Sequence, residues 1–167
     1  MIALHACDTA TDDALWSAVR EKASIIVVAP CCHKEVRRQL DPFMAQAAQK
    51  DHVLADVLRH NIYRERIAET ATDSIRALLL EIAHYSVSVF EFIGGEHTSK
   101  NVMITATKMR KKRSDSEVAQ LRVRLRQLAA LHGVSRQKLA VWMGEPLSDD
   151  DGDGPSQRIS ARGMPPM

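Results

Sequence analysis

The stretch SIIVVA at residues 24–29 decides the fold class, because it is a continuous run of mostly β-branched apolar residues. Such a run is typical of a strand that is buried on both faces, as in a parallel sheet. A shorter apolar strand is expected before it at residues 1–5. Between the two, apolar residues at helical spacing predict a helix that Thr9 or Thr11 caps and that ends near Lys22. The sequence thus predicts a βαβ unit with a right-handed crossover.

The segments after this unit predict helices and then a hairpin. Residues 41–84 are helical in composition and have room for two or three helices, one of which is expected to start at Asp41-Pro42. Residues 85–93 (YSVSVFEFI) and 102–109 (VMITATKM) alternate with period two on either side of a Gly-Gly pair. They predict the two arms of a β-hairpin, so the sheet is expected to end antiparallel.

Two more helices are expected towards the C-terminus. The first begins at Ser114 or Ser116 and carries a heptad-like apolar stripe, and the second is capped by Ser135 and ends near Met143. From Gly144 onward the composition is too poor in apolar residues to offset the entropy of ordering. The predicted organisation is an α/β domain at 1–109, a basic helical extension at 110–143 and a disordered tail at 144–167.

Composition sets broad limits on function. With 167 residues, of which 45% are hydrophobic and 26% charged, the chain is long enough to bury one core. No stretch approaches the roughly 18 apolar residues of a membrane span and no signal-peptide pattern is found, so we expect a cytoplasmic protein without a membrane partner. Between Lys108 and Arg126, eight Lys or Arg stand against two acidic residues, which permits a nucleic acid as partner.

Three polar clusters are expected at strand ends or in the hairpin loop: HACDTATD at 5–12, PCCHKE at 30–35 and GGEHTSKN at 94–101. In an open α/β sheet, ligands bind beyond the carboxyl ends of the strands, because helix N-termini and free loop amides converge there. The first two clusters are therefore expected at a ligand-binding edge.

The side chains of the first cluster have two interpretations. Asp8 and Thr9 follow the first strand, where they could meet the polar groups of a ligand. Alternatively, both residues cap the next helix and Cys7 packs as a small hydrophobic residue.

The second and third clusters are equally open. Cys31, Cys32 and His33 indicate either a metal site or a base beside a nucleophile. Because adjacent cysteines rarely both reach one tetrahedral ion, we expect no metal there. In the third cluster, His97, Lys100 and Asn101 either contact a substrate or belong to ordinary loop chemistry. An odd count of three cysteines, two of them adjacent, predicts reduced thiols.

The two motifs together with the hairpin resemble a known domain. HACDTATD, PCCHKE and a second hairpin arm that starts at Lys100-Asn101-Val102 are similar to the methyltransferase domain of eukaryotic tRNA ribose 2′-O-methyltransferases and of glutathione S-transferase C-terminal-domain-containing proteins. They resemble still more closely a group of bacterial S-adenosylmethionine (SAM)-dependent methyltransferases. The resemblance covers residues 2–109.

The resemblance implies a partial Rossmann-like sheet. In a class I methyltransferase the strand order is 3-2-1-4-5-7-6, and the four strands expected here would be strands 4, 5, 6 and 7. The glycine-rich loop that holds the methionine part of SAM and the acidic residue that holds its ribose would both precede Met1. We therefore expect that the chain is the C-terminal half of the domain, and that an N-terminal half or a partner chain supplies the rest.

The resemblance also implies roles for residues. Those implied as catalytic are His5, Asp8 and His33, with His33 or His5 as the base; those implied at the cofactor are Cys7, Asp8 and Thr9; those implied at the substrate are Cys31, Cys32, His33, His97, Lys100 and Asn101. In the tRNA enzymes the residue that matches Asp8 is usually glycine.

The expected function is therefore SAM-dependent methyl transfer, with RNA as a candidate substrate that binds between Lys108 and Arg126. Two alternatives stay open. The chain could be a non-catalytic module that binds nucleic acid or protein, or an inactive, truncated relic.

Overall fold

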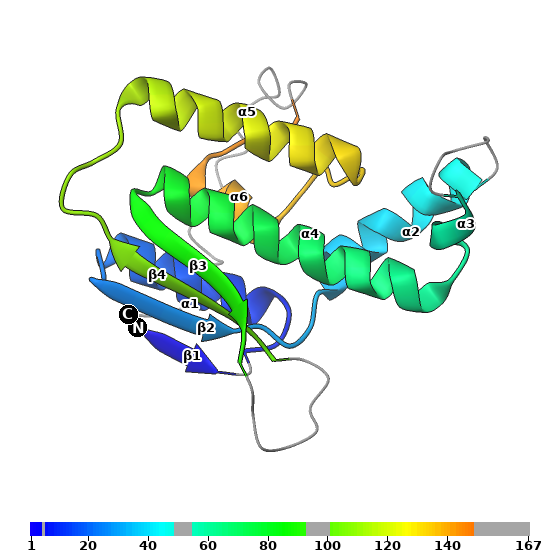
Figure 1. Cartoon of the computed structure of the whole chain (residues 1–167), viewed down its shortest axis with the longest axis horizontal. Helices are drawn as coiled ribbons and strands as arrows, with labels where there is room; N and C mark the ends of the chain where they lie inside the picture. Colours follow the sequence, from blue (N-terminus) through cyan, green and yellow to red (C-terminus); the bar gives the residue numbers. More distant parts are fainter. Residues whose placement is uncertain (5, 49–54, 93–100, 149–167) are drawn as a thin grey trace, which may run out of the picture.

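The computed structural model describes residues 1–4, 6–48, 55–92 and 101–148. The elements in chain order are β1 (Ile2–Leu4), α1 (Thr9–Arg20), β2 (Ile25–Ala29), α2 (Lys34–Ala48), α3 (Ala55–Leu58), α4 (Asn61–Ile82), β3 (Tyr85–Glu91), β4 (Val102–Lys108), α5 (Asp115–Leu131) and α6 (Lys138–Met143) (Figure 1). None of the helices in these ranges is long and apolar enough to cross a membrane.

The four strands form one open, mixed sheet in the order β1-β2-β4-β3. β1 is parallel to β2, with Ile2 opposite Val27, and β4 is antiparallel to both of its neighbours. The βαβ unit, the hairpin and the antiparallel end of the sheet are therefore confirmed. This mixed α/β architecture is compatible with a partial Rossmann-like fold.

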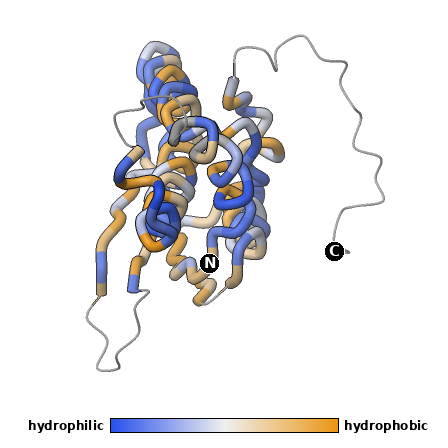
Figure 2. Tube along the Cα trace, turned by 90° about the vertical axis from the view of Figure 1, so that its right-hand side faces the viewer, coloured by the Kyte–Doolittle hydropathy of each residue, from blue (hydrophilic) through white to orange (hydrophobic). Residues whose placement is uncertain are grey.

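The two faces of the sheet differ in burial. One face carries Ile26, Val28 and Ile104, each at most 1% exposed, in the hydrophobic core. On the other face Ile2 is 70% exposed, and Leu4 and Ile25 are each 57% exposed. The prediction that the SIIVVA strand is buried on both faces is wrong for this second face, which we call the open face. The trace beside the N-terminus is coloured as hydrophobic in Figure 2.

The core lies between the buried face of the sheet and the helices. α4 is its central helix, and it contacts α2, α5, β3 and β4. The predicted apolar stripe of α5 is confirmed, because Val118, Leu121 and Leu125 are buried in the same core and α5 lies along α4 (Figure 1). At the other side α6 packs on α1, where the rings of Trp16 and Trp142 are 6.3 Å apart.

Of the predicted helix caps, the cap of α5 is confirmed, whereas those of α6 and α1 differ from the prediction. Ser114 is the N-cap of α5, and with Glu117 it forms a reciprocal capping box. The prediction that Ser135 caps the last helix is wrong, because the side chain of Gln137 accepts the hydrogen bond from the Ala140 amide. Ser135 instead donates its amide to Gln39 Oε1, 3.0 Å away on α2.

The start of α1 also differs from the prediction. Its N-cap residue is Asp8, whose side chain makes no cap hydrogen bond, and Thr9 is already the first helical residue. Thr11 does not cap the helix either, because its hydroxyl donates to the carbonyl of Ala6.

The prediction that Asp41-Pro42 starts a helix is wrong as well, because Pro42 lies inside α2. A proline in a helix interior removes one backbone hydrogen bond. Arg37 holds this part of α2 against α4, since its guanidinium bonds Asp41 on its own helix and Glu65 and Asn61 on α4. These long-range contacts outweigh the local signal for a helix start.

The packed part of the chain continues past the predicted end at Met143. Glu145 and Leu147 are 8% and 3% exposed, and Glu145 accepts two hydrogen bonds of 2.8 Å from Arg122. Residues 149–167 of the predicted tail lie outside the described residues. The boundaries between the three predicted parts stay a prediction.

Candidate functional site

The candidate site lies where the parallel strands β1 and β2 end. Leu4 pairs with Ala29, so the segments that follow the two strands leave the sheet side by side. Cys7 Sγ and Cys31 Sγ are 3.1 Å apart, and Asp8 Oδ1 accepts a 3.0 Å hydrogen bond from the amide of Glu35. The first two polar clusters therefore meet, as the sequence predicts.

The hairpin loop is attached at the same edge of the sheet. Val28 near the end of β2 pairs with Ile104 near the start of β4, because the two strands are antiparallel. Asn101, whose carbonyl accepts from the Phe92 amide at 2.8 Å, closes the described part of the hairpin there. The other predicted residues of this loop, His97 and Lys100, lie outside the described residues, as does His5 after β1.

Asp8 has an unusual backbone at this edge. Its φ of 51° and ψ of −121° lie in a region that favours glycine. Arg76 holds the peptide in place by donating to the Asp8 carbonyl at 2.9 Å. The Asp8 side chain does cap a helix, but it caps α2 rather than the helix that follows it in the chain.

A buried polar network lies directly beneath the two loops. Arg76 of α4, 1% exposed, makes a bidentate pair with Asp12 of α1, at 2.9 and 2.8 Å, and a third contact of 3.1 Å with Asp73. Gln137 at the start of α6 also donates to Asp12, at 2.6 Å. Burial alone would lower the pKa of Arg76, but the hydrogen bonds and charges of Asp12 and Asp73 outweigh it and hold that pKa above its ordinary value. Arg76 therefore stays charged and joins α4 to α1, while Gln137 links Asp12 to the start of α6.

His33, the predicted base, touches this network. Its Nε2 lies 3.0 Å from Asp73 Oδ1, and the residue is 5% exposed. A carboxylate only accepts hydrogen bonds, so a neutral His33 carries its proton on Nε2 and leaves Nδ1 with a lone pair. Among the described residues, Nδ1 has no hydrogen-bond partner. Asp73 thus fixes the tautomer of His33, and Nδ1 is a buried atom whose lone pair no described residue uses.

The cysteines of both motifs form one cluster of thiols that are not joined by a disulfide. Cys31 Sγ lies 3.1 Å from Cys7 Sγ and 3.8 Å from Cys32 Sγ. Burial, followed by hydrogen bonds and charge repulsion from the two neighbouring thiols, raises the pKa of Cys31 to about 12. At neutral pH Cys31 is therefore a thiol, which makes it a poor nucleophile.

Glu35, the last residue of the second cluster, is not simply a solvated side chain at the start of α2. Its carboxylate accepts from the backbone amide of Lys138 at 3.1 Å and so joins α2 to α6. Burial raises the pKa of Glu35, and the charges of Asp12 and Asp8 add to this, although the hydrogen bond from Lys138 acts in the opposite direction.

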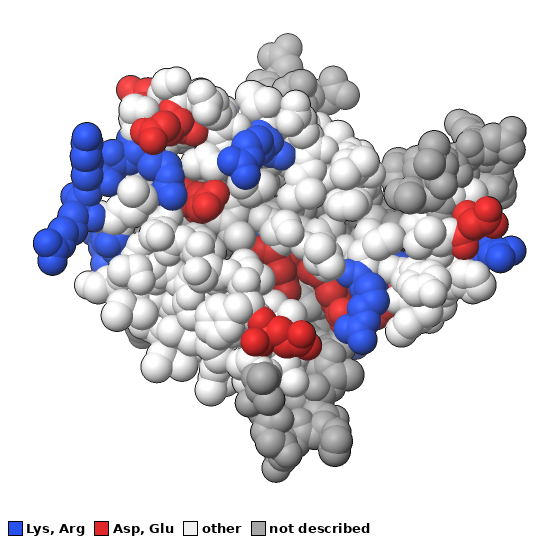
Figure 3. Space-filling view, viewed as in Figure 1, with Lys and Arg blue, Asp and Glu red and all other residues white. Residues whose placement is uncertain are grey.

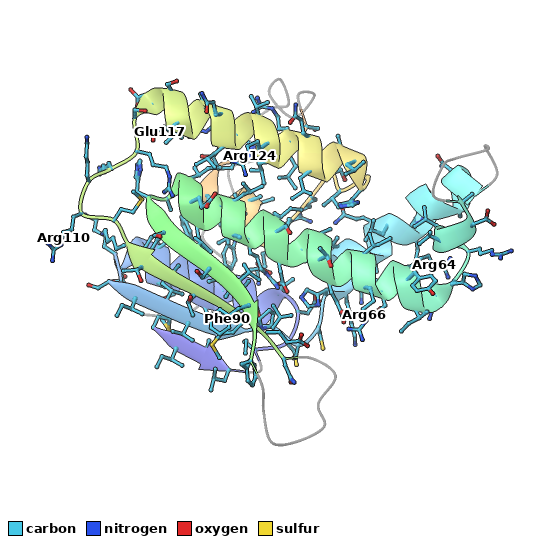
Figure 4. All side chains as sticks on the ribbon, in the orientation of Figure 1. Arg64, Arg66, Phe90, Arg110, Glu117 and Arg124 are labelled. Atoms are coloured by element: carbon cyan, nitrogen blue, oxygen red, sulfur yellow. The ribbon has the colours of Figure 1, made fainter. Side chains whose placement is uncertain are left out.

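A groove of about 760 Å³ lies between α4, α5 and the hairpin. Its lining includes Arg66, Asp73, Leu78, Val89, Val102 and Arg124. Acidic side chains and the cation at Arg66 gather over this part of the molecule (Figures 3 and 4). Because Asp73 lines this groove and also bonds His33, the groove leads from the surface towards the site. No local sequence pattern predicts the groove.

The basic residues between Lys108 and Arg126 are not all available to a ligand. Arg122 is paired with Glu145, and Arg113 donates to the carbonyls of Glu81 and Tyr85 at 2.6 and 2.9 Å. Arg110, Lys111 and Lys112 are exposed in the loop after β4. They form the basic edge at the left of Figure 3, where Figure 4 labels Arg110.

Sequence reasoning missed Asp73, Arg76 and Gln137, the partners that hold the site. The only local signal is the spacing of Asp73 and Arg76, which places two charged side chains one helical turn apart within an apolar helix face. Asp12 belongs to the motif that carried the resemblance, but its partners lie 64 and 125 residues away in the chain.

Comparisons with known proteins bear on the same segment. No curated protein and no solved structure matches the chain. A family model described as a methyltransferase domain matches residues 1–39, which comprise β1, α1, β2 and the first turns of α2. The match includes Cys7, Asp8, Asp12 and the Cys31–His33 loop, and it supports a methyltransferase domain. The matched residues coincide with the strand-end site.

Proposed function

We propose that the chain supplies the C-terminal half of a SAM-dependent methyltransferase. The observation that carries the proposal is the coincidence of the methyltransferase-domain match at residues 1–39 with the polar edge formed by β1 and β2. Ligands of open α/β sheets bind at such an edge. The strand order β1-β2-β4-β3 is the order expected for strands 4, 5, 7 and 6 of the class I sheet.

The open face and the exposed edge of β1 support one part of the proposal, namely that an N-terminal half of the domain packs against this chain. β1 is an edge strand, and Ile2, Leu4 and Ile25 expose apolar side chains beside it. In a complete class I sheet, strand 1 would pair with this edge and the helices of the N-terminal half would cover this face. The proposal assigns the glycine-rich cofactor loop to that half, either earlier in a longer polypeptide or on a partner chain.

The chemistry proposed is in-line transfer of a methyl group from the sulfonium of SAM to an oxygen or nitrogen nucleophile. His33 would accept the proton of the nucleophile at Nδ1, while Asp73 holds the ring through Nε2. Cys7 and Thr9 would lie on the cofactor side and Cys32 on the substrate side. Asp8 would act mainly by position, since Oδ1 and its carbonyl oxygen are engaged by Glu35 and Arg76.

The first test is the intact mass of the native protein, followed by SAM titration. A native mass well above the 18.6 kDa of this chain, or a stable partner that restores SAM binding, is the expected result. Micromolar SAM binding by this chain alone would overturn the claim that the cofactor site is mostly elsewhere. The SAM-binding assembly should transfer labelled methyl groups, and His33→Ala should abolish transfer with SAM affinity retained. His60→Gln, an exposed histidine at the start of α4, is the matched control.

A second candidate function is an RNA-binding module, favoured by the exposed cations Arg110, Lys111 and Lys112. Phosphate contacts by exposed Lys and Arg supply affinity that does not depend on sequence. This candidate moves ahead if the native protein has the mass of this chain and binds RNA without binding SAM.

A further inference from the structure

The fold gathers every cysteine of the chain at one point. The sequence contains three cysteines, one after β1 and two after β2. Because the strands are parallel, both loops leave the same edge of the sheet, and the three sulfur atoms all lie within 4.8 Å of one another. The expectation of no metal came from the adjacency of Cys31 and Cys32 alone, whereas the structure adds Cys7 as a third thiol.

The spacing of the sulfur atoms suits coordination of one ion. Two thiolates bound to a tetrahedral Zn²⁺ lie about 3.8 Å apart, because a Zn–S bond is about 2.3 Å long. The Cys31–Cys32 distance is 3.8 Å, and the Cys7–Cys31 distance is 3.1 Å. An ion can therefore be accommodated by an outward movement of Cys7, which is exposed.

The two loops are held in this relation by contacts that do not involve the thiols. Asp8 Oδ1 accepts from the Glu35 amide, and Arg76 fixes the Asp8 carbonyl from below. The site is thus largely preformed, which lowers the ordering cost of binding.

We propose that Cys7, Cys31 and Cys32 form a binding site for a thiophilic divalent cation of the Zn²⁺ type. The ion binds three thiolates and releases their protons, and its fourth position faces the open side of the cluster, where solvent or a substrate atom completes the coordination. Chemically, this is a soft sulfur site, which discriminates against Mg²⁺ and Ca²⁺. The proposal does not depend on methyl transfer.

The test is a metal titration of the full chain, reduced and freed of metal. Zn²⁺ should bind with a stoichiometry of one per chain, and Co²⁺ should give the ultraviolet charge-transfer absorption of thiolate ligands. Cys7→Ser and Cys31→Ser should each lower Zn²⁺ affinity at least tenfold and weaken the absorption, whereas His60→Gln should leave both unchanged. Mg²⁺ should not compete.

A second measurement uses only the unaltered protein, so it does not depend on whether the variants fold. Zn²⁺ should protect all three cysteines from alkylation, as mapped by peptide mass spectrometry, and a chelator should remove the protection. The proposal is overturned if Zn²⁺ gives no protection, if Co²⁺ gives no thiolate absorption, or if Cys7→Ser binds Zn²⁺ as tightly as the unaltered chain.

Discussion

Asp8 has both a strained backbone and a structural side chain. A residue other than glycine at positive φ costs of order 1 kcal/mol, and the surrounding structure must hold it there. The hydrogen bonds from Arg76 to its carbonyl and from Glu35 to its carboxylate do so. The two contributions of this residue, strain and capping, act in opposite directions and can be separated by substitution.

Asp8→Ala should lower the free energy of unfolding by about 1–2 kcal/mol, because it loses the cap of α2 and keeps the positive φ. Asp8→Gly loses the same cap but relieves the strain, so its cost should be smaller by about 1 kcal/mol. Urea unfolding of both variants checks the difference. Equal losses would show that the backbone at Asp8 is not strained.

Cys31 should react slowly with alkylating reagents when no metal is bound. Its pKa is raised from an ordinary 9.0 to about 12, which reduces the thiolate fraction at pH 8. Since a more basic thiolate is a better nucleophile, the net effect should be an alkylation rate roughly tens of times below that of N-acetylcysteine. Peptide mass spectrometry at timed intervals measures the rate. A rate similar to that of the free thiol would contradict the pKa shift.

At the scale of elements, the charged contacts beneath the site join the helices. Asp12 of α1, Arg76 of α4 and Gln137 before α6 form one buried cluster, and Glu35 of α2 bonds the first amide of α6. Removing one partner of a buried ion pair leaves an uncompensated charge, which is strongly destabilising. These few side chains therefore decide how the helices dock around the strand ends.

Arg76→Met should lower the free energy of unfolding by about 3–5 kcal/mol, since Asp12 and Asp73 then lose their shared cation. Arg66→Met on the same helix is the matched control, because the side chain of Arg66 is 56% exposed where it pairs with Glu69, so its loss should cost less than about 1 kcal/mol. Chemical denaturation of both variants provides the comparison. Similar losses in the two variants would mean that the buried network contributes little.

Glu35 gives a pH dependence whose sign follows from its raised pKa. The folded protein holds the Glu35 proton more tightly than the unfolded chain, so this residue lowers stability as pH rises through its folded pKa. Glu35→Gln keeps an oxygen for the Lys138 amide and removes the charge. The variant should therefore be more stable than the unaltered protein at pH 7, and the gain should shrink towards pH 4. A gain that grows on acidification would contradict the shift.

Local patterns predicted elements whose signals are local. The SIIVVA run, the alternating hairpin arms and Ser114 before an apolar stripe all gave the observed strands and cap. The patterns failed where a residue distant in the chain decides the structure. Ser135 is hydrogen-bonded to Gln39 and does not cap α6, and contacts with α4 hold the proline-containing part of α2. For the same reason the sequence predicted that the loops containing Asp8 and His33 lie side by side. It did not predict that Asp73 and Arg76 of α4 hold these loops in place.

At the scale of the whole molecule, basic charge is concentrated in the loop after β4 rather than along α5. The triple variant Arg110→Ala, Lys111→Ala, Lys112→Ala should weaken RNA binding at low salt and reduce the slope of log K against log salt by about 2. Arg122→Ala, which removes a cation already paired with Glu145, is the control and should change the slope little. Fluorescence anisotropy over a salt series measures both. A larger loss in the control would place the RNA on α5.

The open face of the sheet should also bind fluorescent dyes that are sensitive to apolar surfaces. Dyes that fluoresce on apolar surfaces bind such exposed patches, and here Ile2, Leu4 and Ile25 present one on a folded scaffold. Bound dye should give a bright signal from the native chain, and any polypeptide that seats on that face should quench it. A loss of dye fluorescence from the open face can thus be used to screen for proteins that bind there, before the chemistry of those proteins is known.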